Sequence, residues 1–284
     1  MRGGSAEGFE LRGPSTPLGT LLADLWRARK VLVVLARKDF YARYRRTMFG
    51  MLWAVFLPLL QATVLAIVFT KIVHLATVVH RTNGAHVSFP VFIYSGIAAW
   101  SFFSTNMPSA ATAIVDSGGL ARKIYFPRAL FPLLVVTTGL YPFVIGLGVL
   151  LAMKLALQHS VTVDFFWVIP GALLTVAITA GFGLVLSALH VYFRDVRYIV
   201  QAVMSVLFYL SPIIYAVQSA PGALRHVVGY GPMAGPIEFM RLATGGADSN
   251  WPATVGVGVG WFVVTAGIGM WLQSKYDRVF VDLM

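Results

Sequence analysis

The sequence predicts an all-α membrane protein, and three observations support this fold class. Apolar residues make up 58% of the 284 residues and charged residues only 12%. The mean hydropathy is +0.76, a composition that leaves a water-soluble domain with too little polar surface to cover itself. Six segments are also long and apolar enough to cross a bilayer as helices, which requires roughly 20 residues each.

The chain ahead of the first apolar segment divides into two parts. Residues 1–15 are rich in glycine and polar residues, which predicts a disordered tail. Thr16-Pro17 then provides a helix N-cap with proline at the first helical position. We expect an amphipathic helix over 16–49 in the inner membrane interface, because its aromatic residues gather on one face and its basic residues on the other. A plain basic anchor is the alternative, which explains the charge but explains the regular aromatic face less well.

The six predicted spans belong to one membrane domain, 50–284, and cover about 50–73, 89–113, 129–153, 166–191, 197–217 and 252–272. Residues 218–250 are broken by proline and glycine, yet they are too apolar for a solvated loop. We therefore expect re-entrant or interfacial helices on the outer side between spans five and six. Glu238 and Arg241 lie three residues apart in this segment, a spacing that permits an ordinary helical ion pair.

Small residues at every fourth position predict close helix packing in two of the spans. The sixth span carries Gly256 and Gly260. The fourth span carries the longer stripe, which consists of Gly171, Thr175, Thr179, Gly183 and Ser187.

The basic residues predict the orientation of the chain. Ten of the 22 Lys and Arg residues precede position 50, and 17 of the 22 fall in inner segments when the N-terminus is placed inside. Because cytoplasmic segments carry an excess of Lys and Arg, we expect both termini to be cytoplasmic. The polar stretch before the first span is too long for a signal-peptide n-region, so we expect that span to be an uncleaved anchor.

Several function classes are disfavoured by composition. The absence of cysteine excludes disulfides and thiol catalysis, and the absence of a phosphate-binding loop motif places ATP hydrolysis outside this chain. None of the eleven acidic residues falls at the middle of a predicted span, which argues against a proton- or sodium-coupled secondary transporter. The net charge of +11 does not predict nucleic-acid binding, because the basic residues crowd beside apolar spans. We expect no metal site, since His74, His80 and His86 have no carboxylate nearby in sequence.

The predicted inner loop after the second span has a flexible Gly118-Gly119 entry followed by a coupling segment, which we define as Arg122, Lys123, Ile124, Tyr125, Phe126, Pro127 and Arg128. Its basic residues, aromatic pair and proline predict a short helix that projects an aromatic knob into a partner protein. A membrane-surface loop with interfacial aromatics is the alternative.

Several motifs in register resemble the signature stretches of ABC-2 type permeases that export cell-surface polysaccharide. Besides the coupling segment, these motifs are Arg43-Tyr44-Arg45-Arg46-Thr47-Met48-Phe49-Gly50-Met51-Leu52-Trp53, Pro58-Leu59-Leu60-Gln61, Phe193-Arg194-Asp195-Val196, Ser211-Pro212-Ile213-Ile214-Tyr215 and Gly231-Pro232-Met233. The resemblance implies a homodimer in the bacterial cytoplasmic (inner) membrane that extrudes a lipid-linked glycan. It also implies that two copies of a cytoplasmic ABC ATPase, which hold ATP and Mg, contact residues 18–46 and 118–128.

We predict two kinds of substrate contact. Arginine engages two phosphate oxygens at once, so the phosphate arginines, Arg43, Arg45 and Arg46, are expected to hold the pyrophosphate of the lipid carrier. Aromatic rings can stack on the C–H faces of sugars. The predicted pathway aromatics are Trp53, Phe56, Tyr94, Trp100, Phe102, Phe103, Phe208, Tyr209 and Tyr215.

Two other functions stay open. One is an ABC-2 exporter of a small amphiphile or drug, for which a wide aromatic path is unnecessary. The other is a membrane-embedded lipid-linked glycan transferase, for which His190, Arg194 and Asp195 form the only inner-face acid–base set.

Overall fold

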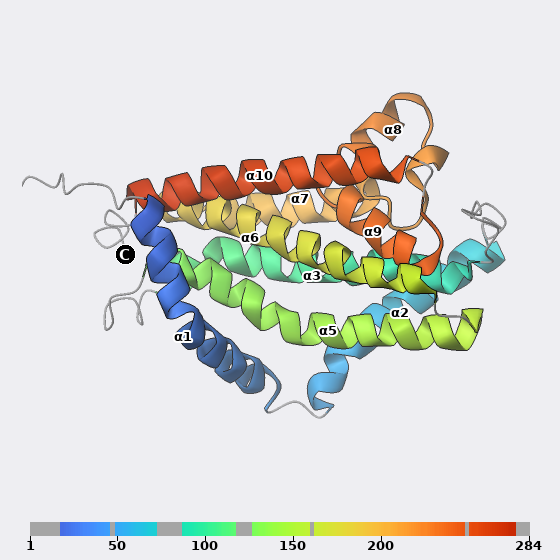
Figure 1. The fold of residues 1–284 in the computed structure, drawn as a ribbon, viewed down its shortest axis with the longest axis horizontal. Helices are drawn as coiled ribbons and strands as arrows, with labels where there is room; N and C mark the ends of the chain where they lie inside the picture. The colour runs from blue at the N-terminus through green and yellow to red at the C-terminus, as the bar shows by residue number, and fades with distance from the viewer. Residues whose placement is uncertain are drawn as a thin grey trace, which may run out of the picture.

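A computed structural model describes residues 18–45, 49–72, 87–117, 127–159, 162–247 and 250–276, and every regular element in these ranges is helical (Figure 1). The α-helices are α1 (Leu18–Tyr44), α2 (Trp53–Ile67), α3 (Phe89–Asp116), α5 (Leu130–Gln158), α6 (Val168–Tyr192), α7 (Val196–Leu210), α8 (Gly222–Gly229), α9 (Ala234–Thr244) and α10 (Trp251–Tyr276). Short helical turns are η1 (Gly50–Leu52), η2 (Val68–Ile72), η4 (Val163–Trp167) and η5 (Val217–Ser219). The predicted disordered tail, 1–15, lies outside the described residues.

In the part of the chain that the structure describes, four helices are long and apolar enough to cross a membrane, at Val55–Ile72, Leu130–Gln158, Val163–Tyr192 and Trp251–Lys275. The α3 helix has 28 residues but carries serine, threonine and asparagine along its length. The α7 helix is apolar but has only 15 residues. The protein is thus a helical multi-pass membrane protein, and the two remaining predicted spans correspond to α3 and α7.

The core is centred on α3, which α2, α5, α6, α7 and α9 all contact. Each residue from Val91 to Trp100 is buried, so neighbouring helices rather than solvent surround this part of α3. The long helices run lengthwise through the molecule, with α1 at one end and α8 and α9 at the other (Figure 1). At the α1 end, Phe40 stacks on Tyr141 of α5 with ring centroids 4.8 Å apart. The apolar face of α1 therefore packs partly on protein.

The small-residue stripe of the fourth predicted span is a packing face, as predicted. Thr175, Thr179 and Ser187 are fully buried, and a Cβ on Gly183 would lie 3.0 Å from the Cβ of Ala110 on α3. The prediction for the sixth span was wrong, because Gly256 and Gly260 have nothing within 4 Å of the place of a Cβ. In α10 the close approaches are made by Gly258 and Gly269.

The predicted fifth span extended too far, because α7 ends at Leu210 and not at residue 217. Pro212 explains the early stop. Proline disfavours helical backbone at the residue before it and has no N–H to continue the ladder. Accordingly, Ser211 is extended, with φ −88° and ψ 141°.

The segment between α7 and α10 is built around a buried cation. Arg241 of α9 pairs with Glu238 at 3.0 Å, and both side chains are fully buried. The Arg241 guanidinium also donates to the carbonyls of Pro212 and Tyr215 and lies 4.1 Å from the Phe92 ring centroid. The predicted ion pair is confirmed, but it also ties α9 to the chain after α7 and to α3.

Candidate functional site

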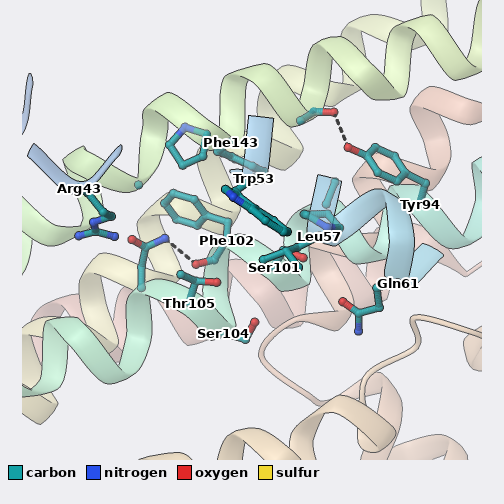
Figure 2. Close-up of a pocket in the computed structure, with 16 residues that line it drawn as sticks. Arg43, Trp53, Leu57, Gln61, Tyr94, Ser101, Phe102, Ser104, Thr105 and Phe143 are labelled. Carbon is teal, nitrogen blue, oxygen red and sulfur yellow. Dashed lines mark hydrogen bonds between the residues drawn. The ribbon is translucent and has the colours of Figure 1, made fainter. Parts of the chain in front are cut away.

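A groove of about 400 Å³ runs between α1, α2, α3 and α5 (Figure 2). Arg43 lies at one end of the labelled residues, Tyr94 and Gln61 lie at the other, and Trp53 lies between them. The groove falls within the range of roughly 300–1,000 Å³ that is typical of ligand pockets. Its lining consists of Arg43, Trp53, Leu57, Pro58, Gln61, Tyr94, Ala98, Ser101, Phe102, Ser104, Thr105, Asn106, Gly139, Pro142, Phe143 and Gly146.

Arg43 stands in the last turn of α1 and is held by a neighbour on the same helix. Its Nη2 lies 3.3 Å from Oδ2 of Asp39, and both side chains are about half exposed. An exposed pair at this spacing constrains the arginine only weakly, since such pairs are worth about 0.3–0.5 kcal/mol. The guanidinium can therefore turn toward an anion in the groove. Arg45 is exposed just after the helix, and Arg46 lies outside the described residues.

The aromatic wall of the groove comes from α2, α3 and α5. The ring centroids of Phe102 and Phe143 lie 4.6 Å apart, which fixes both rings at the α3–α5 contact. Trp53 is partly exposed and meets Phe49 and Phe56 edge to face at 5.5 and 5.7 Å. Three of the pathway aromatics, Trp53, Tyr94 and Phe102, thus line the groove together with one of the phosphate arginines.

One hydrogen bond joins α3 to α5 along the groove, and a second lies within α3. The Tyr94 hydroxyl donates to the Gly146 carbonyl at 3.1 Å (Figure 2). The Asn106 amide donates to the Phe102 carbonyl at 2.7 Å, and Asn106 is only 4% exposed. Pro142 lies inside α5, where proline leaves the carbonyl four residues earlier without its helical partner. The α5 wall therefore combines small residues with a local break in the helical ladder.

The other pathway aromatics lie away from this groove. Trp100 and Phe103 are buried in the core, and Trp100 packs against Phe208 at 5.7 Å. Tyr209 is 72% exposed, and its carbonyl accepts a hydrogen bond from the Tyr215 hydroxyl at 2.8 Å. Phe56 is 52% exposed on α2. Sequence reasoning thus selected residues from the groove, the core and the outer surface of one chain.

The structure describes the coupling segment only in part, the three predicted histidines not at all and the acid–base set completely. In the coupling segment, Arg122 to Phe126 lie outside the described residues, whereas Pro127 is partly exposed and Arg128 is buried beside the start of α5. His74, His80 and His86 also lie outside. Of the acid–base set, His190 is 2% exposed, whereas Arg194 and Asp195 are exposed after α6. A buried imidazole beside two solvated side chains does not form a shared catalytic pocket.

Sequence reasoning missed the uncharged polar residues that alternate with the aromatics on the groove wall, namely Gln61, Ser101, Ser104, Thr105 and Asn106. A signal for them exists in the spacing of α3. Tyr94, Ala98, Ser101 and Thr105 recur at three or four residues, which places them on one helical face. Polar residues at this spacing in a predicted span indicate a face turned away from lipid.

Comparisons with known proteins identify the family to which the chain belongs. Residues 30–243 match the ABC-2 type transporter family. The chain is 32% identical over 197 residues to the O-antigen export system permease protein RfbA of Myxococcus xanthus, which covers 69% of this chain and 72% of that protein. It is 25% identical over 249 residues to a permease of the same name from Klebsiella pneumoniae, covering 87% of this chain and 92% of that protein. It is also 23% identical over 221 residues to the polysialic acid transport protein KpsM of Escherichia coli, covering 77% and 83%. The chain therefore belongs to the ABC-2 type transporter family.

Proposed function

We propose that this chain is the transmembrane permease subunit of an ATP-driven exporter that moves a lipid-linked cell-surface polysaccharide across the bacterial cytoplasmic membrane. Family membership supports a transport role, and the names of the relatives support a polysaccharide cargo. The observation that carries the proposal is the groove, because it combines an arginine at one end with aromatic and uncharged polar side chains along its length.

In this proposal six helices cross the membrane: α2, α3, α5, α6, α7 and α10. The N-terminal helix lies in the inner interface, and α8 and α9 form interfacial helices on the outer side. The concentration of 17 of 22 basic residues in the inner segments supports cytoplasmic termini. Two copies of the chain form a homodimer around the glycan path.

The motor is a separate pair of cytoplasmic ABC ATPase subunits, which bind ATP and Mg. This division of labour follows from the family and from the missing phosphate-binding loop motif in this chain. We propose that α1 and the coupling segment contact the ATPase. Arg128 is buried beside the start of α5, so a movement of the coupling segment caused by the ATPase would be transmitted to α5, which lines the groove.

The substrate contacts divide by chemistry. The phosphate arginines engage the carrier pyrophosphate at the inner end of the groove, since arginine donors match phosphate oxygens in pairs. Trp53 and Phe102 offer rings to the C–H faces of sugars. Polar side chains between these rings exchange hydrogen bonds with sugar hydroxyls, which suits a polymer that slides past without one strong site.

Export of a defined lipid-linked glycan tests the proposal. The chain and its partner ATPase are co-purified, reconstituted in vesicles and supplied with ATP and the lipid-linked glycan. We expect an ATP-dependent movement of glycan across the membrane. Failure to move the glycan while a small drug-like amphiphile is moved would favour the second type of exporter, and transferase activity without an ATPase would favour the enzyme.

The arginines are tested separately. The Arg43→Gln/Arg45→Gln/Arg46→Gln variant should bind the ATPase but export poorly, whereas the matched triple Lys variant should keep part of the activity because it keeps the charge. Normal export by the Gln variant would refute the phosphate role and leave the transport proposal standing.

A further inference from the structure

The groove wall has little charge among its described residues, and this bears on the kind of sugar that the groove can accept. Among the described residues that line the groove, Arg43 is the only charged one. It stands in the last turn of α1, and its guanidinium lies 3.3 Å from a carboxylate oxygen of Asp39. The rest of the described wall is aromatic, aliphatic, or of the hydroxyl and amide type. A ligand that enters beyond Arg43 meets no cation from these residues.

The uncharged polar residues are placed where a hydroxylated ring would contact them. Ser101 and Thr105 lie one helical turn apart on α3, and Gln61 lies across the groove on α2. Hydroxyl and amide groups can each donate and accept hydrogen bonds, as sugar hydroxyls do. They supply no full positive charge, so they compensate the buried dipole of a hydroxyl far better than the buried charge of a carboxylate.

The wall is also held in place. Asn106 is 4% exposed, and its side-chain amide donates a hydrogen bond to the Phe102 carbonyl. The Tyr94 hydroxyl is bonded to α5 at the other end. These contacts fix the polar groups of Asn106 and Tyr94 in the wall, and neither group carries a positive charge.

We propose that the groove accepts sugar units without charge, such as neutral hexoses, and discriminates against units that carry a carboxylate. The inference rests on the proposed export of a lipid-linked glycan and adds the class of sugar. The anionic carrier is not affected by this discrimination, because its phosphates lie at the arginine end.

Two matched substrates test the proposal in vesicles that hold the complex of the chain with its ATPase. Both are tetrasaccharides on the same polyprenyl pyrophosphate, one built of neutral hexoses and the other with alternate hexoses replaced by hexuronic acids. We expect the neutral substrate to be exported faster by about tenfold or more, since a carboxylate at membrane depth is strongly disfavoured. Equal rates, or faster export of the acidic substrate, would overturn the inference and leave export intact. No ATP-dependent export of either would overturn both.

A charge placed on the wall gives a second readout. Thr105→Lys adds a cation to the groove, whereas Ser109→Lys adds the same cation one turn along α3, at an exposed position that does not belong to the described lining. We expect Thr105→Lys to lower the ratio of the export rate of the neutral substrate to that of the acidic substrate. Ser109→Lys should leave this ratio unchanged. An identical ratio in both variants would contradict a role for the groove wall. The comparison of the two substrates on the unmodified chain holds even where a variant fails to fold.

Discussion

The Asn106 side chain of α3 occupies the space that any side chain at position 139 of α5 would need. A Cβ on Gly139 would lie 2.6 Å from the Cγ of Asn106. Because real Cβ atoms do not approach other atoms this closely, the two positions are coupled. The missing side chain on α5 lets α3 place an amide in the groove wall.

Replacing Gly139 with alanine should therefore impair export. The added methyl group displaces Asn106 or separates α3 from α5, and overpacking of this kind costs about 1–3 kcal/mol. We expect a lower export rate and a lower Tm in detergent. Gly148→Ala on the same helix is the control, because nothing lies within 4 Å of its Cβ position. Export and Tm unchanged in Gly139→Ala would show that the contact is unimportant.

Arg241→Met should destabilise the segment between α7 and α10. The change leaves Glu238 buried without its main cation and frees the carbonyls of Pro212 and Tyr215, and breaking a buried pair costs about 3–5 kcal/mol. Thermal unfolding in detergent should report a large fall in Tm. The double variant Arg241→Met/Glu238→Leu should recover part of the loss because neither charge of this pair is left buried without the other.

The control for the arginine is an exposed pair on α1. Arg27 lies 3.4 Å from Asp24 with its side chain 81% exposed, so Arg27→Met should change stability by less than about 1 kcal/mol. An equal fall in Tm in Arg241→Met and Arg27→Met would contradict the role of Arg241 in joining α9 to the chain after α7.

The sequence predicts where the helices lie along the chain, but it predicts poorly which of their faces contact other helices. The glycines of α10 illustrate why. Hydropathy and length suffice to place a helix near residues 252–272, within a few residues of Trp251–Tyr276. The spacing of Gly256 and Gly260 suggested a contact, but which side of α10 faces α6 depends on how the helices rotate in the assembled bundle. That rotation is decided by contacts far apart in sequence.

The same limit applies to the groove. Trp53, Tyr94 and Phe102 could be named from the sequence because aromatic rings can stack on sugars. Trp100 and Phe103 satisfy the same criterion but do not line the groove. Tyr94 and Phe102 are as buried as Trp100 and Phe103, so only their place in the groove lining separates the two groups. That place depends on the packing of α2, α5 and α7 around α3. Asn106 was missed because its role arises only opposite Gly139.

Gly269→Ala should weaken the contact between α6 and α10. Its Cβ would lie 2.7 Å from the Cβ of Leu184, so one helix must shift, at a cost of about 1–3 kcal/mol. Nearby, Gln273 donates to the Leu184 carbonyl at 3.0 Å, and this bond should lengthen as well. Gly267→Ala, two residues away with open space around it, should be neutral or slightly stabilising because alanine favours helix. Equal Tm values for the two variants would contradict the packing.

Trp53→Ala and Phe103→Ala should fail in different ways, because the first ring lines the groove and the second is buried in the core. Loss of the fully buried Phe103 ring costs about 3–5 kcal/mol, so we expect less protein in the membrane and a proportionate loss of export. Trp53 is partly exposed, so its loss should leave membrane abundance close to normal while export per molecule falls. Trp53→Phe should restore part of that export, since a flat ring is kept for the sugar face. Quantitative immunoblots of membranes and surface glycan together separate the two effects, and full export per molecule in Trp53→Ala would remove Trp53 from the glycan path.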